Sequence, residues 1–211
     1  MGWTYGNKPN DVMVWVREQY AVTDEANQIT QRCVDAAMVN MREIYAAVEQ
    51  KDKYGITTVS AGVIRIQFLR EGQDGLNYPQ MGYSFQSENA GPNEINCPER
   101  ILKLLTPTES AWANEWRQKC RNTLERRSAA RNLKIGDYIQ FEEPIKFSKG
   151  GTWDIFKIES GLNQKKRLTA ISGETGERIF AASIPDWQAK YAFKKLDEAD
   201  LPWRQTSGMR P

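Results

Sequence analysis

The side chains that could carry out chemistry are few and widely spaced along the chain. There is no histidine, which excludes serine–histidine and cysteine–histidine nucleophiles and any histidine-ligated metal site. The carboxylates that could form an acid–base pair or hold a metal ion are Glu94, Glu99, Glu142, Glu143 and Asp154. Nothing in their spacing demands either role, and the chain has no glycine-rich phosphate loop or nucleophile elbow. We therefore expect a protein that is not an enzyme and that uses no catalytic residue, cofactor or metal.

The three cysteines are Cys33, Cys97 and Cys120. Their odd number and wide separation are typical of a reducing compartment and provide no zinc-ligand spacing. Cys97 precedes Pro98 at the start of a predicted helix, a position that lowers the pKa of a thiol. Because no histidine accompanies it, a buried structural thiol is the favoured interpretation.

A segment that we interpret as irregular, neither helix nor strand, runs from about residue 71 to residue 96. Loops of this length are uncommon inside a compact domain and are typically functional or disordered. We predict a surface loop that presents side chains to a partner, with a turn fixed by Gly91-Pro92. The predicted partner-binding residues are Tyr83, Phe85, Glu88, Asn89 and Pro92. The alternative is a packed connector whose aromatic side chains cover the sheet or a neighbouring helix.

A second candidate site is the basic stretch from residue 113 to residue 134, which holds seven basic and two acidic residues. Together with lysines on the strands that follow, it could form a phosphate-binding surface. The residues that would bind nucleic acid are Arg117, Arg121, Arg126, Arg127, Arg131 and Lys134. The alternative is a solvated helix end whose cations complement the helix dipole. We favour that alternative because no helix-turn-helix, zinc or RNA-binding signature accompanies the stretch.

The composition is that of a folded globular protein. Of the 211 residues 40% are hydrophobic, and they include seven Trp, eight Tyr and seven Phe. The 29 basic and 27 acidic residues give a formal net charge of +2, so no global field steers the chain toward nucleic acid or a membrane. The longest apolar runs, such as residues 12–16, are about five residues long, so we expect no signal peptide, no membrane span and a cytoplasmic location.

The elements that must hold the candidate residues begin with a helix and a sheet. Asn10 can cap a helix that runs to about Tyr20. Ile64, Ile66 and Phe68 alternate with less apolar residues, which predicts a strand. We expect an antiparallel meander of three strands between residues 29 and 69, although residues 29–42 also fit a helix.

Two helices are predicted after the irregular segment. Pro98 can open a short helix that ends near Leu105. A longer helix is expected from Glu109 to about Arg126, with one apolar stripe. The stripe consists of Trp112, Trp116, Cys120 and Leu124.

Beyond residue 133 the pattern changes to short strands separated by turn signals at residues 149–151 and 172–176. A small barrel of the SH3-like type is an economical solution for such strands, because closure leaves few open edges. The predicted fold is therefore α+β, an antiparallel meander packed by helices and followed by this barrel. We expect an α+β domain at 1–126 that carries the long central loop, a β-barrel domain at 133–196, and a tail at 197–211.

Several strings of the sequence resemble an uncharacterised family of proteins encoded by phages, plasmids and related mobile elements. These strings are Met1-Gly2-Trp3-Thr4, Tyr45-Ala46-Ala47-Val48-Glu49, Gly82-Tyr83, Gly91-Pro92, Cys97-Pro98-Glu99-Arg100-Ile101-Leu102 and Trp116-Arg117. They span the first two thirds of the chain. The family is a domain of unknown function without agreed catalytic residues. The resemblance therefore implies that the protein is encoded by a mobile element and implies no particular reaction.

These observations predict a non-enzymatic interaction protein of a phage or mobile element, located in the cytoplasm of the host cell. It would bind and occlude a host protein or ribonucleoprotein complex. The resemblance implies inhibition of a host defence system, of the anti-CRISPR or anti-restriction type. The alternative function is a nucleic-acid-binding accessory protein that uses the basic helix end and the β-barrel.

Overall fold

The computed structural model describes residues 2–72, 75, 77–148, 151–161 and 166–207, with only the backbone of residues 205–207. The chain divides into two compact units, Met1–Leu124 and Glu125–Pro211. The boundary falls inside helix α3 (Ala111–Asn132). Each unit is built on an antiparallel sheet, and strands dominate over helices. The α+β class is therefore confirmed.

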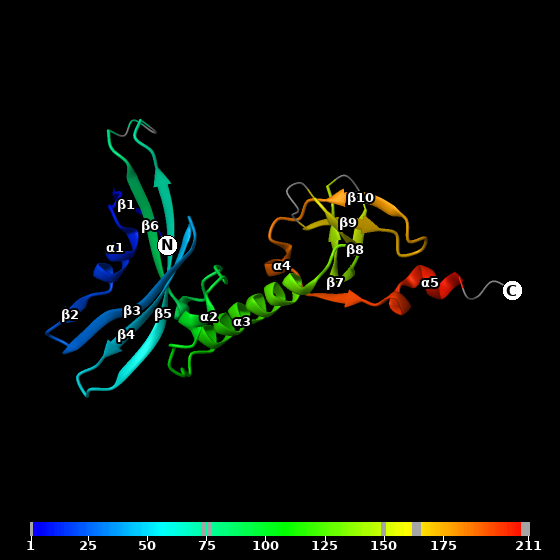
Figure 1. Ribbon diagram of the computed structural model, residues 1–211. Helices are drawn as coiled ribbons and strands as arrows, with labels where there is room; N and C mark the ends of the chain where they lie inside the picture. The colour runs from blue at the N-terminus through cyan, green and yellow to red at the C-terminus, as the bar shows by residue number, and fades with distance from the viewer. Residues whose placement is uncertain (1, 73–74, 76, 149–150, 162–165, 208–211) are drawn as a thin grey trace. The chain divides into compact units, whose positions relative to one another are not determined.

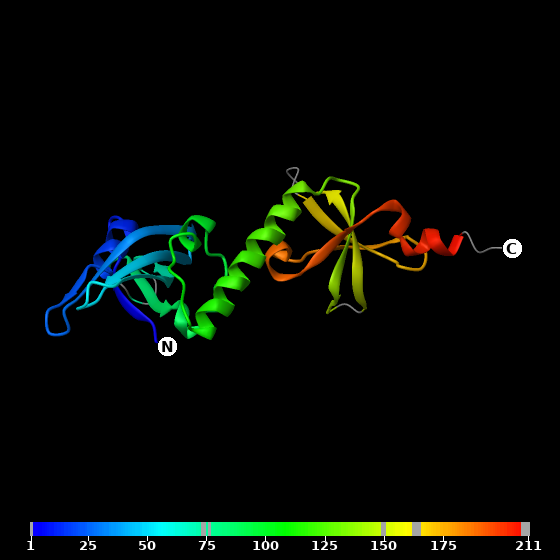
Figure 2. The same cartoon turned by 90° about the horizontal axis from the view of Figure 1, so that it is seen from below.

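A curled six-stranded sheet forms the frame of the first unit (Figure 1, Figure 2). In spatial order its strands are β1 (Thr4–Asn7), β6 (Gln80–Ser87), β5 (Thr57–Leu69), β4 (Glu43–Lys51), β3 (Ile29–Asn40) and β2 (Val22–Asp24). All neighbouring pairs are antiparallel. Residues 29–40 of the segment 29–42, which also fitted a helix, therefore form a strand, and the predicted meander gains β6 as a fourth member.

Helices cover both faces of this sheet, so the central strand β4 is buried on both sides. Ile44 and Ala46 point to the face covered by α1 (Val12–Gln19) and pack with Val16. Tyr45 points to the other face, where α2 (Glu99–Leu102) and α3 lie, and its ring stacks on Trp116 with centroids 6.4 Å apart. Burial on both sides explains the nearly continuous apolar run of β4.

The helix boundaries differ slightly from those predicted. Asp11, rather than Asn10, caps α1, because its carboxylate accepts hydrogen bonds from the backbone N–H of Met13 (2.7 Å) and Val14 (3.1 Å). Helix α3 continues to Asn132, six residues beyond the predicted end at Arg126.

The predicted apolar stripe of the long helix is only partly internal. Trp116 and Cys120 are buried, whereas Trp112 is 65% exposed. The Trp112 ring lies over Gly91, where an added Cβ would stand 3.2 Å from its Cε3 atom. This end of the stripe covers a glycine turn and is not part of the core.

The largest correction concerns residues 80–90 of the segment 71–96, which form no surface loop, whereas the described residues of the segment before Gln80 are exposed. Strand β6 occupies residues 80–87 and pairs with β5 along its whole length, with Tyr83 opposite Ile66 and Phe85 opposite Ile64. The 3-10 turn η2 (Glu88–Ala90) follows it. The apolar residues of β6 alternate with Gly82 and other small or polar residues, and that composition resembles a loop although its period is that of a strand.

The second unit contains a five-stranded antiparallel sheet. In spatial order its strands are β10 (Arg178–Ala182), β9 (Lys166–Ile171), β8 (Thr152–Ser160), β7 (Tyr138–Lys146) and β11 (Phe193–Leu196). Helix α4 (Trp187–Lys190) lies between β10 and β11, while η4 (Glu198–Asp200) and α5 (Pro202–Ser207) follow β11. The order leaves β10 and β11 as its two ends, so closure into an SH3-like barrel stays a prediction.

Aromatic side chains form much of the core of the second unit. Phe141 packs edge-on against Phe156 and Trp187, with ring centroids 5.2 and 5.9 Å apart. Trp187 in turn packs on Phe193 of β11 at 5.2 Å. The short helix α4 thus ties the last strand of the sheet to its centre.

None of the helices in the described part of the chain has the length and apolar character that crossing a membrane requires. The expected cytoplasmic location stays a prediction.

Gly62 of β5 offers a test of the packing against α1. A Cβ at this position would stand 2.7 Å from Cζ of Tyr20, whose ring packs edge-on against Phe85 at 5.7 Å. We expect Gly62→Ala to lower the free energy of unfolding by about 1–3 kcal/mol, because the partly buried Tyr20 ring must move. The matched control is Gly6→Ala in β1, where an added Cβ meets nothing within 4 Å. Urea denaturation measures the free energy of unfolding of both variants. If Gly62→Ala is as stable as Gly6→Ala, Tyr20 does not occupy this position.

Candidate functional site

Two of the predicted partner-binding residues pack against the sheet and helix α1. Tyr83 and Phe85 are half-buried, and their rings lie 4.9 and 5.8 Å from the ring of Trp15. Glu88 and Pro92 are buried, whereas Asn89 is exposed. This arrangement matches the packed connector, the alternative interpretation of the segment.

Glu88 is buried in an ion pair with Arg117, the first of the predicted nucleic-acid-binding residues. Nε and Nη2 of Arg117 donate to the two carboxylate oxygens of Glu88 at 2.7 and 2.6 Å. The third donor, Nη1, bonds the backbone carbonyl of Thr106 at 2.7 Å. The side chains of Arg117 and Glu88 are only 6% and 1% exposed. The two predicted sites therefore each contribute one residue to a single internal ion pair.

The rest of the basic stretch is only partly available to a ligand. Nη2 of Arg126 donates to the carbonyl of Ala189 at 2.7 Å, and Nη2 of Arg127 lies 3.1 Å from a carboxylate oxygen of Asp186. Three of the predicted residues are exposed: Arg121, Arg131 and Lys134. Three of the six predicted nucleic-acid-binding residues thus make contacts within the protein.

The segment that follows η2 is fixed onto the sheet by hydrogen bonds. Nε1 of Trp116 donates to the carbonyl of Glu94 at 2.9 Å. The backbone N–H of Asn96 donates to the hydroxyl of Tyr45 at 2.9 Å, and its side-chain amide donates to Glu43 at 2.8 Å. The Tyr45 hydroxyl itself donates to the same Glu43 carboxylate at 2.8 Å. Burial, and then the charge of Glu43, raise the pKa of Tyr45, so this phenol remains a donor.

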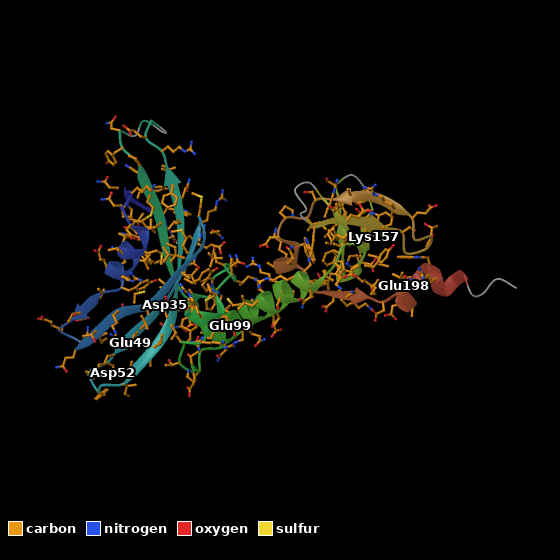
Figure 3. All side chains as sticks on the ribbon, in the orientation of Figure 1. Asp35, Glu49, Asp52, Glu99, Lys157 and Glu198 are labelled. Carbon is orange, nitrogen blue, oxygen red and sulfur yellow. The ribbon has the colours of Figure 1, made fainter. Side chains whose placement is uncertain are left out.

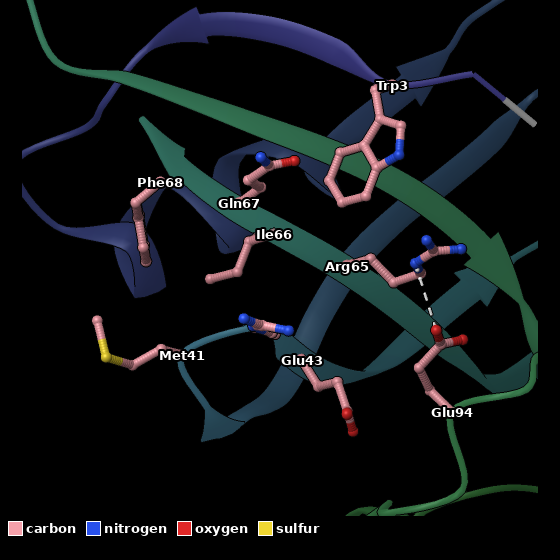
Figure 4. A pocket seen from close by; sticks show the side chains of 9 residues that line it. Trp3, Met41, Glu43, Arg65, Ile66, Gln67, Phe68 and Glu94 are labelled. Carbon is pink, nitrogen blue, oxygen red and sulfur yellow. Dashed lines mark ion pairs between the residues drawn. The ribbon is translucent and has the colours of Figure 1, made fainter. Parts of the chain in front are cut away.

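Beside this segment the first unit has an open pocket of about 700 Å³, which we call the β5 notch (Figure 4). Its lining residues are Trp3, Met41, Arg42, Glu43, Arg65, Ile66, Gln67, Phe68 and Glu94. They come from the chain before β1, from the β3–β4 turn, from the start of β4, from β5 and from the fixed segment after η2. The β5 notch is thus a product of the sheet together with its anchored segment.

An arginine lies between a carboxylate and an aromatic ring in the β5 notch. Nε of Arg65 is 3.3 Å from Oε1 of Glu94, and Cζ of Arg65 is 5.2 Å from the centroid of the Trp3 ring (Figure 4). Trp3 remains 37% exposed, and Met41 on the β3–β4 turn is 72% exposed. The surface therefore combines apolar contact area with positive charge.

The pocket exists because two neighbouring strands differ in length. Strand β4 has 9 residues and β5 has 13. Their ladder ends at the pair Glu43 and Arg65, followed by one hydrogen bond of 2.9 Å from the backbone N–H of Ile66 to the carbonyl of Arg42. The N–H of Arg42 donates to Oδ1 of Asn40 at 2.7 Å and so turns away from β5. Among the described strands, none continues beside residues 67–69 on this side of β5.

The two buried thiols near this arrangement are not activated as nucleophiles. Burial raises the pKa of the Cys97 thiol, so the position before α2 does not produce a thiolate. Burial also raises the pKa of Cys120 to about 12. Both thiols remain protonated at neutral pH.

Three of the carboxylates considered as candidates have partners of another kind within their own unit. Glu94 pairs with Arg65. Glu99, an exposed residue at the start of α2 (Figure 3), pairs with Lys103 at the end of the same helix, at 2.8 Å. Asp154 accepts from the side-chain amide of Gln140 at 2.6 Å. Within the described residues, no three His, Cys, Asp or Glu side chains gather closely enough to hold a metal ion.

Comparison with known proteins adds one match. Residues 107–182 match the model of a domain of unknown function (DUF6927). The matched part contains α3 and strands β7 to β10. Of the strings that carried the resemblance to mobile-element proteins, it includes only Trp116-Arg117, so the mobile-element setting stays a prediction. No curated protein and no solved structure matches the chain.

Sequence reasoning did not single out Arg42 or Arg65 as functional residues. The signal that could have pointed to them is the unequal length of β4 and β5, because a longer strand beside a shorter one leaves an unpaired end. That signal requires the ends of both strands, and strand ends are poorly defined by the alternation of residues alone.

The buried ion pair generates a stability prediction. We expect Arg117→Met to lower the free energy of unfolding by about 3–5 kcal/mol, because the carboxyl group of Glu88 would be left buried without its partner. The double variant Glu88→Leu/Arg117→Met should lose less than the sum of the two single losses, since it leaves no unpaired charge. Arg121→Ala is the matched control on the exposed side of the same helix, with an expected change within about 0.5 kcal/mol. Urea denaturation measures the free energy of unfolding of each variant. If the loss in the double variant equals the sum of the two single losses, the two residues are not a coupled pair.

Proposed function

We propose that the protein is a non-enzymatic binding protein that docks a partner protein on the β5 notch. The observation that carries the proposal is an open pocket of about 700 Å³ in which a strand end, two arginines and a tryptophan are brought together. Concave surfaces with aromatic contact area and a few placed polar groups are typical binding sites. Tryptophan and arginine are also the residues that most often dominate binding energies at protein interfaces.

The walls of the β5 notch are held in place before a partner arrives. Hydrogen bonds from Trp116 and Asn96 fix the segment that carries Glu94, and Glu94 in turn orients Arg65. A preorganised site loses less conformational entropy on binding. This supports a role in recognition.

In this proposal the partner is a host protein or ribonucleoprotein complex, and binding occludes its surface. Three parts of this proposal rest only on the resemblance of the sequence strings to mobile-element proteins. They are the phage or mobile-element origin, the location in the host cytoplasm and the inhibition of a defence system. We also retain the SH3-like barrel as a proposal for the second unit. It is supported by the strand order, because β11, the last strand of that sheet in the sequence, pairs with β7, the first one in the sequence.

Nucleic-acid binding is the second candidate. It retains three exposed cations, Arg121, Arg131 and Lys134, after Arg117 is assigned to the interior. We rank it below protein binding because three of its six predicted residues, Arg117, Arg126 and Arg127, make contacts within the protein.

Copurification with variants of the β5 notch tests the proposal. Met41→Glu/Arg42→Glu changes two exposed residues of the β3–β4 turn, so the fold should be retained. We expect a stoichiometric partner in the wild-type protein, at least tenfold less in this variant, and an unchanged amount with the control Arg121→Glu. A partner that is retained by the notch variant, or the absence of any stoichiometric partner, would contradict the proposal. Loss with Arg121→Glu alone, reversed by nuclease, would favour the nucleic-acid alternative.

A further inference from the structure

The end of β5 presents to the β5 notch main-chain groups that have no backbone partner among the described residues. Successive residues of a strand direct their N–H and C=O groups to opposite sides. Because the N–H of Ile66 bonds to Arg42 on the β4 side, the N–H and C=O of Phe68 point to the same side. On the other side β5 remains paired with β6 as far as Leu69 opposite Gln80. The described residues place no strand beside Phe68 on the side of the β5 notch.

The charges of the β5 notch are not equally available to a ligand. Glu43 accepts from Tyr45 and Asn96. One carboxylate oxygen of Glu94 faces Arg65 at 3.3 Å, and the other is shielded from solvent. Both negative side chains are therefore engaged with, or enclosed by, the protein itself.

The two guanidinium groups are open by comparison. Arg42 is exposed, and its side chain makes no ion pair with any residue that the structure describes. Arg65 is 39% exposed in its side chain, and within the described chain its terminal amino groups donate no hydrogen bond. Guanidinium groups bind carboxylates through paired, charge-assisted hydrogen bonds. The surface that a ligand meets is therefore cationic, although the pocket contains equal numbers of arginines and glutamates.

We propose that the occupant of the β5 notch is an extended peptide segment with a carboxylate. The segment adds to β5 as a short strand at Phe68, and its carboxylate binds Arg42 and Arg65. Strand addition to an exposed sheet edge gives affinity through main-chain hydrogen bonds, while side-chain contacts give specificity. Trp3 and Met41 provide the apolar contact surface beside that strand. The inference rests on the proposed function and specifies the chemistry of the partner.

The carboxylate has two sources, an acidic side chain or a free C-terminus. A bead-displayed library of random octapeptides, prepared with free and with amidated C-termini, separates them. We expect the full-length protein to enrich peptides that contain Asp or Glu if the side chain is the source. If the C-terminus is the source, amidation should abolish enrichment. Either outcome supports a carboxylate ligand, and enrichment of peptides without any carboxylate, or with basic residues instead, would overturn it.

Variants connect the library result to the β5 notch. Arg42→Gln removes the more open guanidinium from an exposed turn and should reduce the affinity of an enriched peptide about tenfold or more. The control Arg121→Gln removes an exposed guanidinium from helix α3 and should leave the affinity unchanged. Equal affinities for the wild-type protein and Arg42→Gln would overturn the assignment.

N-methylation of the enriched peptide tests strand addition. Only alternate residues of an added strand face β5, so N-methyl groups at one set of alternate positions should weaken binding about tenfold, and those at the other set should not. Equal effects at both sets would overturn strand addition. If no peptide is enriched while a copurified partner depends on Met41 and Arg42, this inference fails and the proposed function stands. If that dependence is absent as well, both fail.

Discussion

A single buried guanidinium connects the parts of the first unit that are far apart in the sequence. Arg117 of α3 binds the carboxylate of Glu88 after β6 and the carbonyl of Thr106 before α3. Thr106 in turn exchanges hydrogen bonds with Val59 of β5, at 3.0 Å from its N–H and 3.1 Å to its hydroxyl. A buried charge without a partner is strongly unfavourable, so the three segments must meet for the unit to fold. The ion pair thereby acts as a constraint on geometry more than as a source of net stability.

The β5 notch depends on the same constraint. The ion pair fixes the start of η2, and residues after η2 are held by Trp116, Tyr45 and Glu43. These contacts place Glu94 beside Arg65. The unequal lengths of β4 and β5 supply the opening, and the anchored segment supplies its wall. The shape of the β5 notch therefore follows from interactions that lie mostly beneath it.

Some of this architecture could be predicted from the sequence. The strand β5 was recognisable because Ile64, Ile66 and Phe68 alternate with other residues, and helix α3 because Trp116 and Cys120 recur four residues apart. Strand β6 was not recognised, since small and polar residues such as Ser84 occupy one of its faces, and Ser84 is nevertheless buried. The pairing of Glu88 with Arg117 could not be predicted, because 29 residues separate them and charged residues are expected at the surface. The β5 notch was missed for a related reason: it is defined by where strands end and by contacts between distant segments.

Native-state hydrogen exchange of the Arg117→Lys variant tests the central claim most directly, because lysine keeps the charge but loses the paired geometry of the guanidinium. The informative amide is that of Asn96, whose N–H bonds to Tyr45 in the wall of the β5 notch. Our account predicts that this amide exchanges about tenfold or more faster in the variant, while the amide of Phe156 in the second unit is unchanged. Unaltered protection of Asn96 would show that the buried ion pair does not hold the wall of the notch in place.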